Sequence, residues 1–188
     1  MSAAVAGEDG RLRCPWALST ADYVAYHDDE WGVPLRTDDA MFERLTLEAF
    51  QSGLSWLIIL RKRDGFRRAF DGFSIPAVAA YDATDVERLL ADSGIVRNRA
   101  KIEAAITNAA VAAELPGGLL KYVEGFAPTE QVPAPRELSE IPSQSPESVA
   151  LAKDLRRRGA RFVGPTTLYA LLQATGLVND HLADCFRR

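Results

Sequence analysis

Several features that mark other protein classes are scarce in this sequence. Its 188 residues include only two cysteines and two histidines. No apolar run approaches the roughly 20 residues that a transmembrane helix needs. Residues 1–10 lack the basic and then hydrophobic segments of a signal peptide. We therefore expect a cytoplasmic protein without membrane contact, with a disordered tail over residues 1–12 and one domain over residues 13–188.

The sequence also lacks an excess of positive charge: its 22 Lys and Arg residues are outnumbered by 26 Asp and Glu residues, so the formal net charge is −4. This balance argues against a protein that coats nucleic acid by bulk electrostatics, but it allows a local basic face. The basic side chains do cluster, and such clusters are either ordinary helix surface or part of a binding face. The clusters are Arg61–Arg63 with Arg67 and Arg68, Arg97 with Arg99 and Lys101, and Arg156–Arg158 with Arg161.

The alternation of apolar and polar residues that is typical of strands is nearly absent, whereas helical spacing is frequent. Thr20 and Thr37 are suited to begin helices, and Thr84 with Glu87 has the spacing of a capping box. The pattern predicts an all-α fold. The expected helices begin at residues 20 and 37 and continue at 55–70, 84–94, 99–115, 146–158 and 166–175, with a last short one from residue 179.

A stretch rich in proline interrupts this pattern. Residues 127–146 contain five prolines and read as a long irregular connection. We expect it to join two helical lobes around a cleft, and to form the hinge or the rim of that cleft.

Four residues near the ends of the chain have the chemistry of metal ligands: Cys14, His27, His181 and Cys185. On a helix, His181 and Cys185 would share one face, since they are four residues apart. Two thiolates and two imidazoles suit tetrahedral zinc, and four protein ligands make the site structural. The alternative is that the cysteines are buried thiols and the histidines are hydrogen-bonded core residues. If both histidines bind metal, none is left to act as a general base.

Longer blocks of the sequence resemble one family. The blocks follow the family's order and spacing over roughly residues 13–185, and they identify the chain as similar to 3-methyladenine DNA glycosylase I, of the helix-hairpin-helix superfamily. They are Arg13-Cys14-Pro15-Trp16, Tyr26-His27-Asp28-Asp29-Glu30-Trp31-Gly32-Val33-Pro34, Leu47-Glu48-Ala49-Phe50-Gln51-Ser52-Gly53-Leu54-Ser55-Trp56, Gly94-Ile95-Val96-Arg97-Asn98-Arg99-Ala100-Lys101-Ile102, Leu138-Ser139-Glu140-Ile141-Pro142, Phe162-Val163-Gly164 and Gly176-Leu177-Val178-Asn179-Asp180-His181.

The resemblance implies a helix-hairpin-helix fold in which one structural zinc ion joins the N- and C-terminal segments. It places the zinc ligands on the four residues chosen above from their chemistry. It places base recognition on Tyr26, Glu48 and Trp56, with Tyr23 as a further pocket position. Asp180 is expected to orient the imidazole of His181 or to cap a helix.

The expected chemistry explains these residue types. A glycosylase must take its target base out of the duplex. Adenine methylated at N3 is cationic, so it gains a cation–π interaction of about 0.5–2 kcal/mol from aromatic faces, and we expect Tyr26 and Trp56 to sandwich it. Glu48 would accept a hydrogen bond from the exocyclic amine, and it is also our predicted catalytic residue. From the sequence pattern alone, Glu48 could instead be a solvated helix residue.

Contacts with DNA are expected from two segments. Gln51, Gly53 and Leu54 follow the Glu48 helix, and Leu54 is suited to fill the gap left by a flipped base, although it could also be a core residue. The resemblance assigns the grip on phosphates to the hairpin from Ile95 to Lys101, where Arg97 and Lys101 are basic. Two departures concern such loops. Ala100 stands where the family often has glycine, and Pro165 stands where relatives commonly have a small polar residue.

The resulting prediction is a monomeric enzyme that acts on double-stranded DNA containing 3-methyladenine and hydrolyses its N-glycosidic bond. No lysine presents itself as a Schiff-base nucleophile, so we expect base removal without strand cleavage. Two alternatives remain from the sequence. One is a zinc-containing DNA-binding module without activity, and the other is a helical protein-interaction domain.

Overall fold

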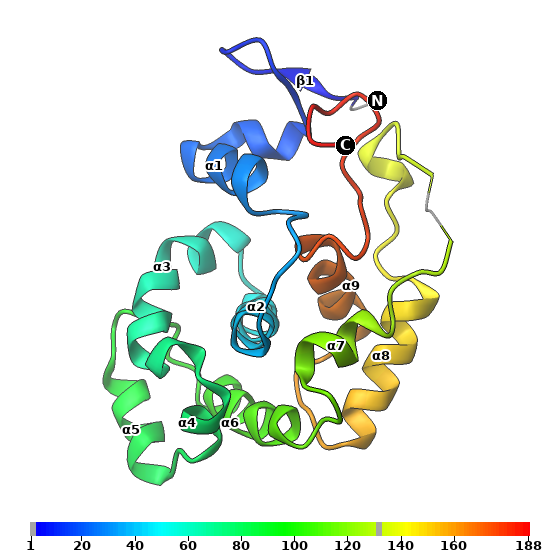
Figure 1. Ribbon diagram of the computed structural model, residues 1–188. Coiled ribbons are helices and arrows are strands. Elements are labelled where there is room, and N and C mark those ends of the chain that lie inside the picture. The colour runs from blue at the N-terminus through cyan, green and yellow to red at the C-terminus, as the bar shows by residue number, and fades with distance from the viewer. Residues whose placement is uncertain (1–2, 131–132) are drawn as a thin grey trace.

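The computed structural model of the chain describes residues 3–130 and 133–188, and helices dominate it (Figure 1). The expected helical fold class is confirmed, and no described helix is long and apolar enough to cross a membrane. The α-helices are α1 (Ala21–Asp29), α2 (Asp38–Gln51), α3 (Trp56–Ala69), α4 (Ile75–Ala79), α5 (Ala83–Ala91), α6 (Arg99–Ala113), α7 (Leu119–Glu124), α8 (Pro146–Arg157) and α9 (Pro165–Ala174). Three 3₁₀ turns, η1 (Pro15–Ser19), η2 (Asp71–Phe73) and η3 (Leu138–Glu140), and two short strands, β1 (Val5–Ala6) and β2 (Leu12–Arg13), complete the described elements.

Several predicted helix starts are confirmed. The side chains of Thr20 and Thr37 accept hydrogen bonds from backbone amides of the first turns of α1 and α2. Ser145 opens α8 with a reciprocal capping box. Pro165 is the first residue of α9, where a missing N–H is harmless and the fixed φ suits a helix. This departure from the family pattern is therefore compatible with the local structure.

One predicted helix start and one predicted helix are wrong. The capping box of α5 is formed by Asp82 and Asp85, two residues before the expected pair, because the Asp82 carboxylate accepts from the amides of Thr84 and Asp85. Residues 179–188 form turns and not a last helix. There, the Asn179 side chain accepts from the His181 amide, so the chain begins its turn through a side-chain contact.

Helix α2 lies at the centre of the molecule. It packs against α3, α4, α6, α7 and α9, and it is seen end-on between the other helices in Figure 1. Residues from Met41 to Phe50 are buried almost without interruption, apart from the partly buried Glu43. A helix enclosed on nearly all sides has no solvent face for its polar residues. Polar side chains on α2 are therefore held inside the protein.

The N-terminal segment differs from the disordered tail that the sequence predicted for residues 1–12. Strands β1 and β2 pair in antiparallel fashion, and the Arg13 guanidinium bonds to the Asp9 carboxylate across the turn. The amide of Phe186 donates to the carbonyl of Leu12 at 2.9 Å, which joins this ribbon to the C-terminal segment. The two ends of the chain therefore lie together, as Figure 1 shows. Residues 1–2 lie outside the described residues.

The proline-rich connection is irregular apart from η3, as expected, and residues 131–132 lie outside the described residues. Its carbonyl at Pro135 accepts from the amide of Ala183 at 2.8 Å, so it too is fixed to the C-terminal segment. Leu138 and Ile141 pack beside the cluster that contains Cys14 and Cys185. The connection thus borders the region where the two ends of the chain meet.

Candidate functional site

A cavity of about 510 Å³ lies where α1, the end of α2, the start of α3, η3 and α9 converge. Five of its twelve lining residues are aromatic, and Glu48 is the carboxylate among them. Such a cavity is within the size range of pockets for small molecules. Its lining residues are Trp16, Ser19, Tyr23, Tyr26, Trp31, Glu48, Gln51, Trp56, Leu138, Ile141, Ala170 and Gln173.

The structure brings together all four predicted base-recognition residues, but not as a sandwich. The rings of Tyr26 and Trp56 touch at a centroid distance of 5.4 Å and are tilted by 49°. A planar base has no room between two rings in direct contact, so it would have to lie against an open face instead. The indole N–H of Trp56 is buried without a partner among the described residues, which leaves it available to a ligand or to water.

Two tryptophans of the cavity were not assigned a role from the sequence. The ring of Trp16 lies edge-on to that of Trp31 at a centroid distance of 5.1 Å, and edge-on to Tyr23 at 5.9 Å. Trp16 follows Cys14 by two residues, and Trp31 is four residues after His27. Their closeness in sequence to metal-ligand candidates was the signal that could have identified them.

Glu48 is buried inside this aromatic cavity, with 5% of its surface exposed. The surface-helix alternative is therefore excluded. Burial raises the pKa of its carboxyl group to about 7, and the nearby positive charge of Arg44 opposes that rise. No hydrogen bond to this carboxylate occurs within the described part of the chain, which is unusual for a buried acid. The arrangement is suited to receive a hydrogen-bond donor or a cation.

Two further buried polar residues, Arg44 and Asp180, form hydrogen bonds with residues that line the cavity. Arg44 lies one turn before Glu48 on α2 and donates to the hydroxyl of Tyr26 at 2.5 Å. Asp180 was expected to orient His181 or to cap a helix. Its carboxylate instead accepts from Tyr169 at 2.6 Å and from the amide of the cavity residue Gln173 at 2.7 Å.

The connection from α2 to α3 carries the predicted wedge. Gly53 has φ of +77°, a backbone conformation that favours glycine. Leu54 is 37% exposed at the surface, so it is not a core residue. Gln51 lines the cavity beside this loop. The loop therefore presents an apolar side chain to solvent next to the pocket.

The two predicted phosphate contacts have different surroundings. Arg97 is exposed in the loop between α5 and α6. Lys101 is buried in α6, and its ammonium donates to the carbonyls of Phe50 at 2.8 Å and Ser52 at 2.6 Å. It satisfies backbone groups at the end of α2 that the helix leaves unpaired. Lys101 thus anchors the wedge loop and is not placed to contact phosphate.

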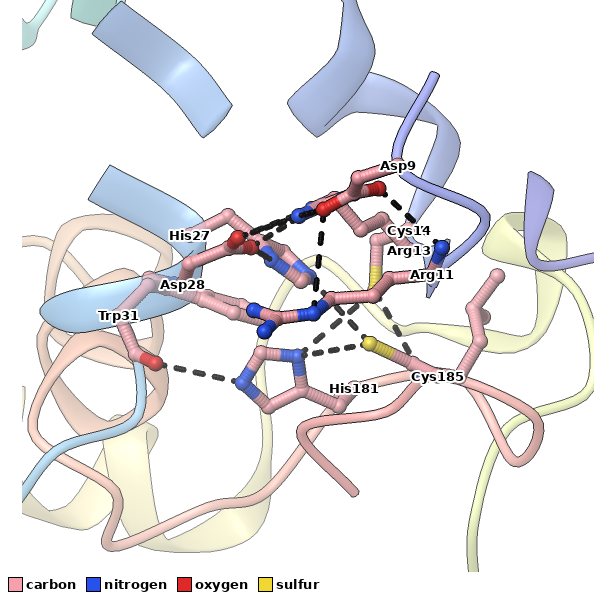
Figure 2. Close-up of polar contacts among 10 residues, drawn as sticks. Asp9, Arg11, Arg13, Cys14, His27, Asp28, Trp31, His181 and Cys185 are labelled. Atoms are coloured by element: carbon pink, nitrogen blue, oxygen red, sulfur yellow. Dashed lines mark hydrogen bonds and ion pairs between the residues drawn. The ribbon is translucent and has the colours of Figure 1, made fainter. Parts of the chain in front are cut away.

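The four predicted metal ligands meet between the two ends of the chain, and all four are buried (Figure 2). The Cys185 sulfur lies 3.4 Å from Nε2 of His27 and 3.5 Å from Nδ1 of His181. The Cys14 sulfur lies 3.9 Å from the same Nδ1. In tetrahedral zinc sites, bonds of about 2.1 Å to nitrogen and 2.3 Å to sulfur separate two such ligands by about 3.6 Å. The donor set therefore has the spacing of a tetrahedral metal site.

Contacts around the cluster fix both imidazoles. Nδ1 of His27 donates to the carboxylate of Asp28 at 2.8 Å, and Arg13 holds the other side of that carboxylate. Nε2 of His181 lies 3.2 Å from the carbonyl oxygen of Trp31. Such partners on the outer nitrogens are typical of histidines that bind metal through the other nitrogen. Nε2 of His27 and Nδ1 of His181 are thereby left to face the sulfurs.

Comparisons with known proteins agree with this geometry. A family model described as methyladenine glycosylase matches residues 16–188. The chain is 44% identical to DNA-3-methyladenine glycosylase 1 of Escherichia coli (strain K12), over 92% of this chain and 95% of that protein. It is 39% identical to the DNA-3-methyladenine glycosylase of Haemophilus influenzae, over 92% and 96% respectively. The chain therefore belongs to the methyladenine glycosylase family.

Solved structures extend the similarity to the fold. A crystal structure of 3-methyladenine DNA glycosylase I matches with a TM-score of 0.87 and 43% identity, covering 93% of this chain and 98% of that one. The Staphylococcus aureus enzyme, studied for its recognition of 3-methyladenine, matches with a TM-score of 0.88 and 32% identity, covering 93% and 95%. A tyrosine-to-phenylalanine variant of 3-methyladenine DNA glycosylase I in complex with 3-methyladenine matches at 0.87 and 32%, covering 93% and 96%.

The burial of Glu48 predicts how stability depends on pH. A carboxyl pKa raised from 4.5 to about 7 means that the folded state binds the proton more tightly than the unfolded state does. This group is neutral in both states at low pH, and between about pH 4.5 and 7 its ionisation lowers the free energy of unfolding. The stability of Glu48→Gln relative to the parent should therefore rise by roughly 3 kcal/mol from about pH 4 to about pH 8.

Urea unfolding of both proteins at the two pH values measures this difference. The exposed Glu124→Gln, which removes the same charge from α7, is the control. A difference between Glu48→Gln and the parent that stays constant with pH would show that the carboxyl group is solvated in the folded protein.

Proposed function

We propose that this chain is a DNA glycosylase that removes 3-methyladenine from alkylated DNA by hydrolysis of its N-glycosidic bond. The observation that carries the proposal is the buried Glu48 carboxylate, which has no hydrogen-bond partner among the described residues and lies in a cavity with aromatic walls. A flipped cationic base supplies what this cavity lacks, because its amine donates to the carboxylate and its charge attracts both the carboxylate and the rings. Membership of the family and the names of its relatives support the same substrate.

The chemistry needs little more than recognition. An adenine that is already cationic is a good leaving group, so the site requires no strong general acid. The residues that line the cavity include no lysine, which supports base removal without formation of a Schiff base or cleavage of the strand. In this proposal, Glu48 and the aromatic walls stabilise the base as it leaves, and Tyr23, Tyr26 and Trp56 form part of its binding surface.

The role of Glu48 in recognition can be tested by Glu48→Gln, which keeps the shape and removes the charge. We expect the affinity for free 3-methyladenine to fall by about 1–3 kcal/mol, the range for hydrogen bonds to charged groups. Release of 3-methyladenine from alkylated DNA should fall at least as far. Guanine methylated at N7 presents a carbonyl in place of the amine, so the parent protein should release it poorly. Base release by both proteins, measured by chromatography, is the assay.

Two results would contradict parts of the proposal. Equal 3-methyladenine release by parent and variant would remove Glu48 from the pocket assignment. Binding of alkylated duplex by the parent without any base release would favour a DNA-binding module without activity.

For the four-residue cluster we propose one structural zinc ion, held by Cys14, His27, His181 and Cys185. The two thiols and two oriented imidazoles fit zinc, and they leave no position open for a catalytic water. The ion would hold the N- and C-terminal segments together, and its binding free energy would add to folding stability.

Protein purified without chelators should contain one zinc ion per chain by elemental analysis. Cys185→Ala should lose the metal and unfold at a markedly lower temperature, because three ligands bind zinc less tightly than four. Ser139→Ala, an exposed change in η3 next to the same segment, is the matched control. Metal-free protein with an unchanged melting temperature would contradict the proposal.

We further propose that the protein acts as a cytoplasmic monomer on double-stranded DNA, and that the loop between α2 and α3 enters the duplex beside the flipped base. The support is the exposure of Leu54 next to the cavity, on a loop whose Gly53 allows close backbone approach. Gln51 lines the cavity beside this loop, and Arg97, which is exposed in the loop between α5 and α6, would contact phosphate.

Leu54→Ala should weaken binding to duplex DNA that contains a lesion, because the gap left by the base is no longer filled. Excision from single strands and binding of the free base should change little. Exposed Val149→Ala on α8 provides the control for loss of a surface apolar group. Binding isotherms on duplex and single-stranded lesions measure the effect, and equal loss on both substrates would place Leu54 outside the duplex.

A further inference from the structure

Arg44 is a buried cation in contact with the walls of the cavity. Only 8% of its surface is exposed, and its guanidinium lies 5.3 Å from the ring centroid of Tyr26 and 5.8 Å from that of Trp56. A positive charge at this place is unexpected, since the proposed ligand is itself a cation and like charges repel. Its presence calls for a role that outweighs the repulsion.

The charges around Arg44 reduce that repulsion. Its guanidinium lies 3.8 Å from the carboxylate of Glu30, and Arg63 on α3 binds the same carboxylate through two nitrogens. With Glu48 ionised, the two guanidiniums and the two carboxylates balance. With Glu48 protonated, the group would carry one positive charge before any base enters. Arg44 therefore favours the carboxylate form of Glu48, which the cationic base also requires.

Arg44 also determines how the Tyr26 hydroxyl can bond. A guanidinium has donors only, so in the 2.5 Å contact the phenol oxygen accepts. The hydroxyl proton must then point elsewhere, and no acceptor for it occurs among the described residues. Among the described residues that line the cavity, the Tyr26 hydroxyl and the Trp56 indole N–H thus have a proton left to donate, and the Glu48 carboxylate can accept. Adenine presents the complement, an amine donor beside a ring nitrogen acceptor.

We propose that Arg44 is a positioning residue for base recognition, which holds Tyr26 as a hydrogen-bond donor and keeps Glu48 as a charged acceptor. This inference rests on the proposed function, because it concerns the same pocket and the same base. Arg44 selects for an adenine edge without being the group that the base needs to contact. It also resolves the apparent conflict of a buried arginine beside a site for a cation.

The titratable and charged groups that face Glu48 allow the effect to be attributed. Arg44 on α2 and Tyr26 on α1 face Glu48, while Glu30 at the end of α1 and Arg63 on α3 lie near Tyr26. Of these, Arg44 is the one whose positive charge lowers the pKa of Glu48 against the effect of burial. Replacement of Arg44 by a neutral residue should consequently raise that pKa further.

The test compares Arg44→Met, similar in length but uncharged, with the parent and with Arg67→Met. Arg67 lies on α3, pairs with Glu43 and Asp64, and does not line the cavity. Affinity for free 3-methyladenine is measured by calorimetry from about pH 6 to about pH 9. Protonation of the ligand is common to all proteins, so the ratio of affinities isolates the contribution of the protein.

For Arg44→Met we expect affinity about tenfold lower than the parent near neutral pH, with part of the loss recovered at high pH, where Glu48 ionises without assistance. The carboxyl carbon signal of Glu48, followed by NMR without ligand, should titrate about one pH unit higher than in the parent. Arg44→Lys should keep the titration near that of the parent, because it retains the charge. Arg67→Met should behave as the parent does.

A merely structural role would lower affinity equally at every pH and leave the Glu48 titration unmoved, and either result overturns the inference. If the parent binds 3-methyladenine and Arg44→Met has the same affinity for it as Arg67→Met, only the proposed role of Arg44 is contradicted. If the parent binds no 3-methyladenine, the proposed function falls, and the role of Arg44 in recognition falls with it.

Discussion

The convergence of four donor side chains from the two ends of the sequence is the constraint on which the cavity depends. Cys14 precedes Trp16 by two residues, and His27 directly follows Tyr26. His181 contacts the carbonyl of Trp31. Three aromatic walls of the cavity are thus each attached to a donor or to its hydrogen-bond partner. Whatever holds the four donors together therefore also fixes the spacing of the walls.

Two charged side chains, Glu48 and Arg44, are buried at or beside the cavity. Glu48 and Arg44 lie on the most enclosed helix of the protein, where desolvation disfavours the ionised form of each. Glu30 and Arg63 offset part of this penalty from neighbouring elements. A charge network of this kind stabilises folding poorly, since apolar residues would fill the same space at lower free energy. Its value lies in a pocket that is polarised before the ligand arrives.

The sequence predicted what local patterns encode. The role of Thr37 as an N-cap follows from a short-range rule. Cys14 and Cys185 could be identified as candidate metal ligands because cysteine and histidine are scarce in this sequence. The sequence did not predict the features that depend on burial of one helix by the helices around it. No pattern in the sequence singled out Arg44, which the surrounding helices bury. The resemblance assigned Lys101 to phosphate contact, and no sequence pattern shows that α6 runs against the end of α2, where Lys101 is buried.

The meeting of the chain ends has a consequence for synthesis. A growing polypeptide emerges with Cys14 and His27 first, and their two partners, His181 and Cys185, follow only after every described helix has been made. The central helices can pack while two of the four donor residues beside the aromatic walls have not yet been made. A truncated product that ends before residue 181 would retain α2 and Glu48 but would lack a complete donor set. The donor set beside the aromatic walls is therefore complete only once the C-terminal segment has been made.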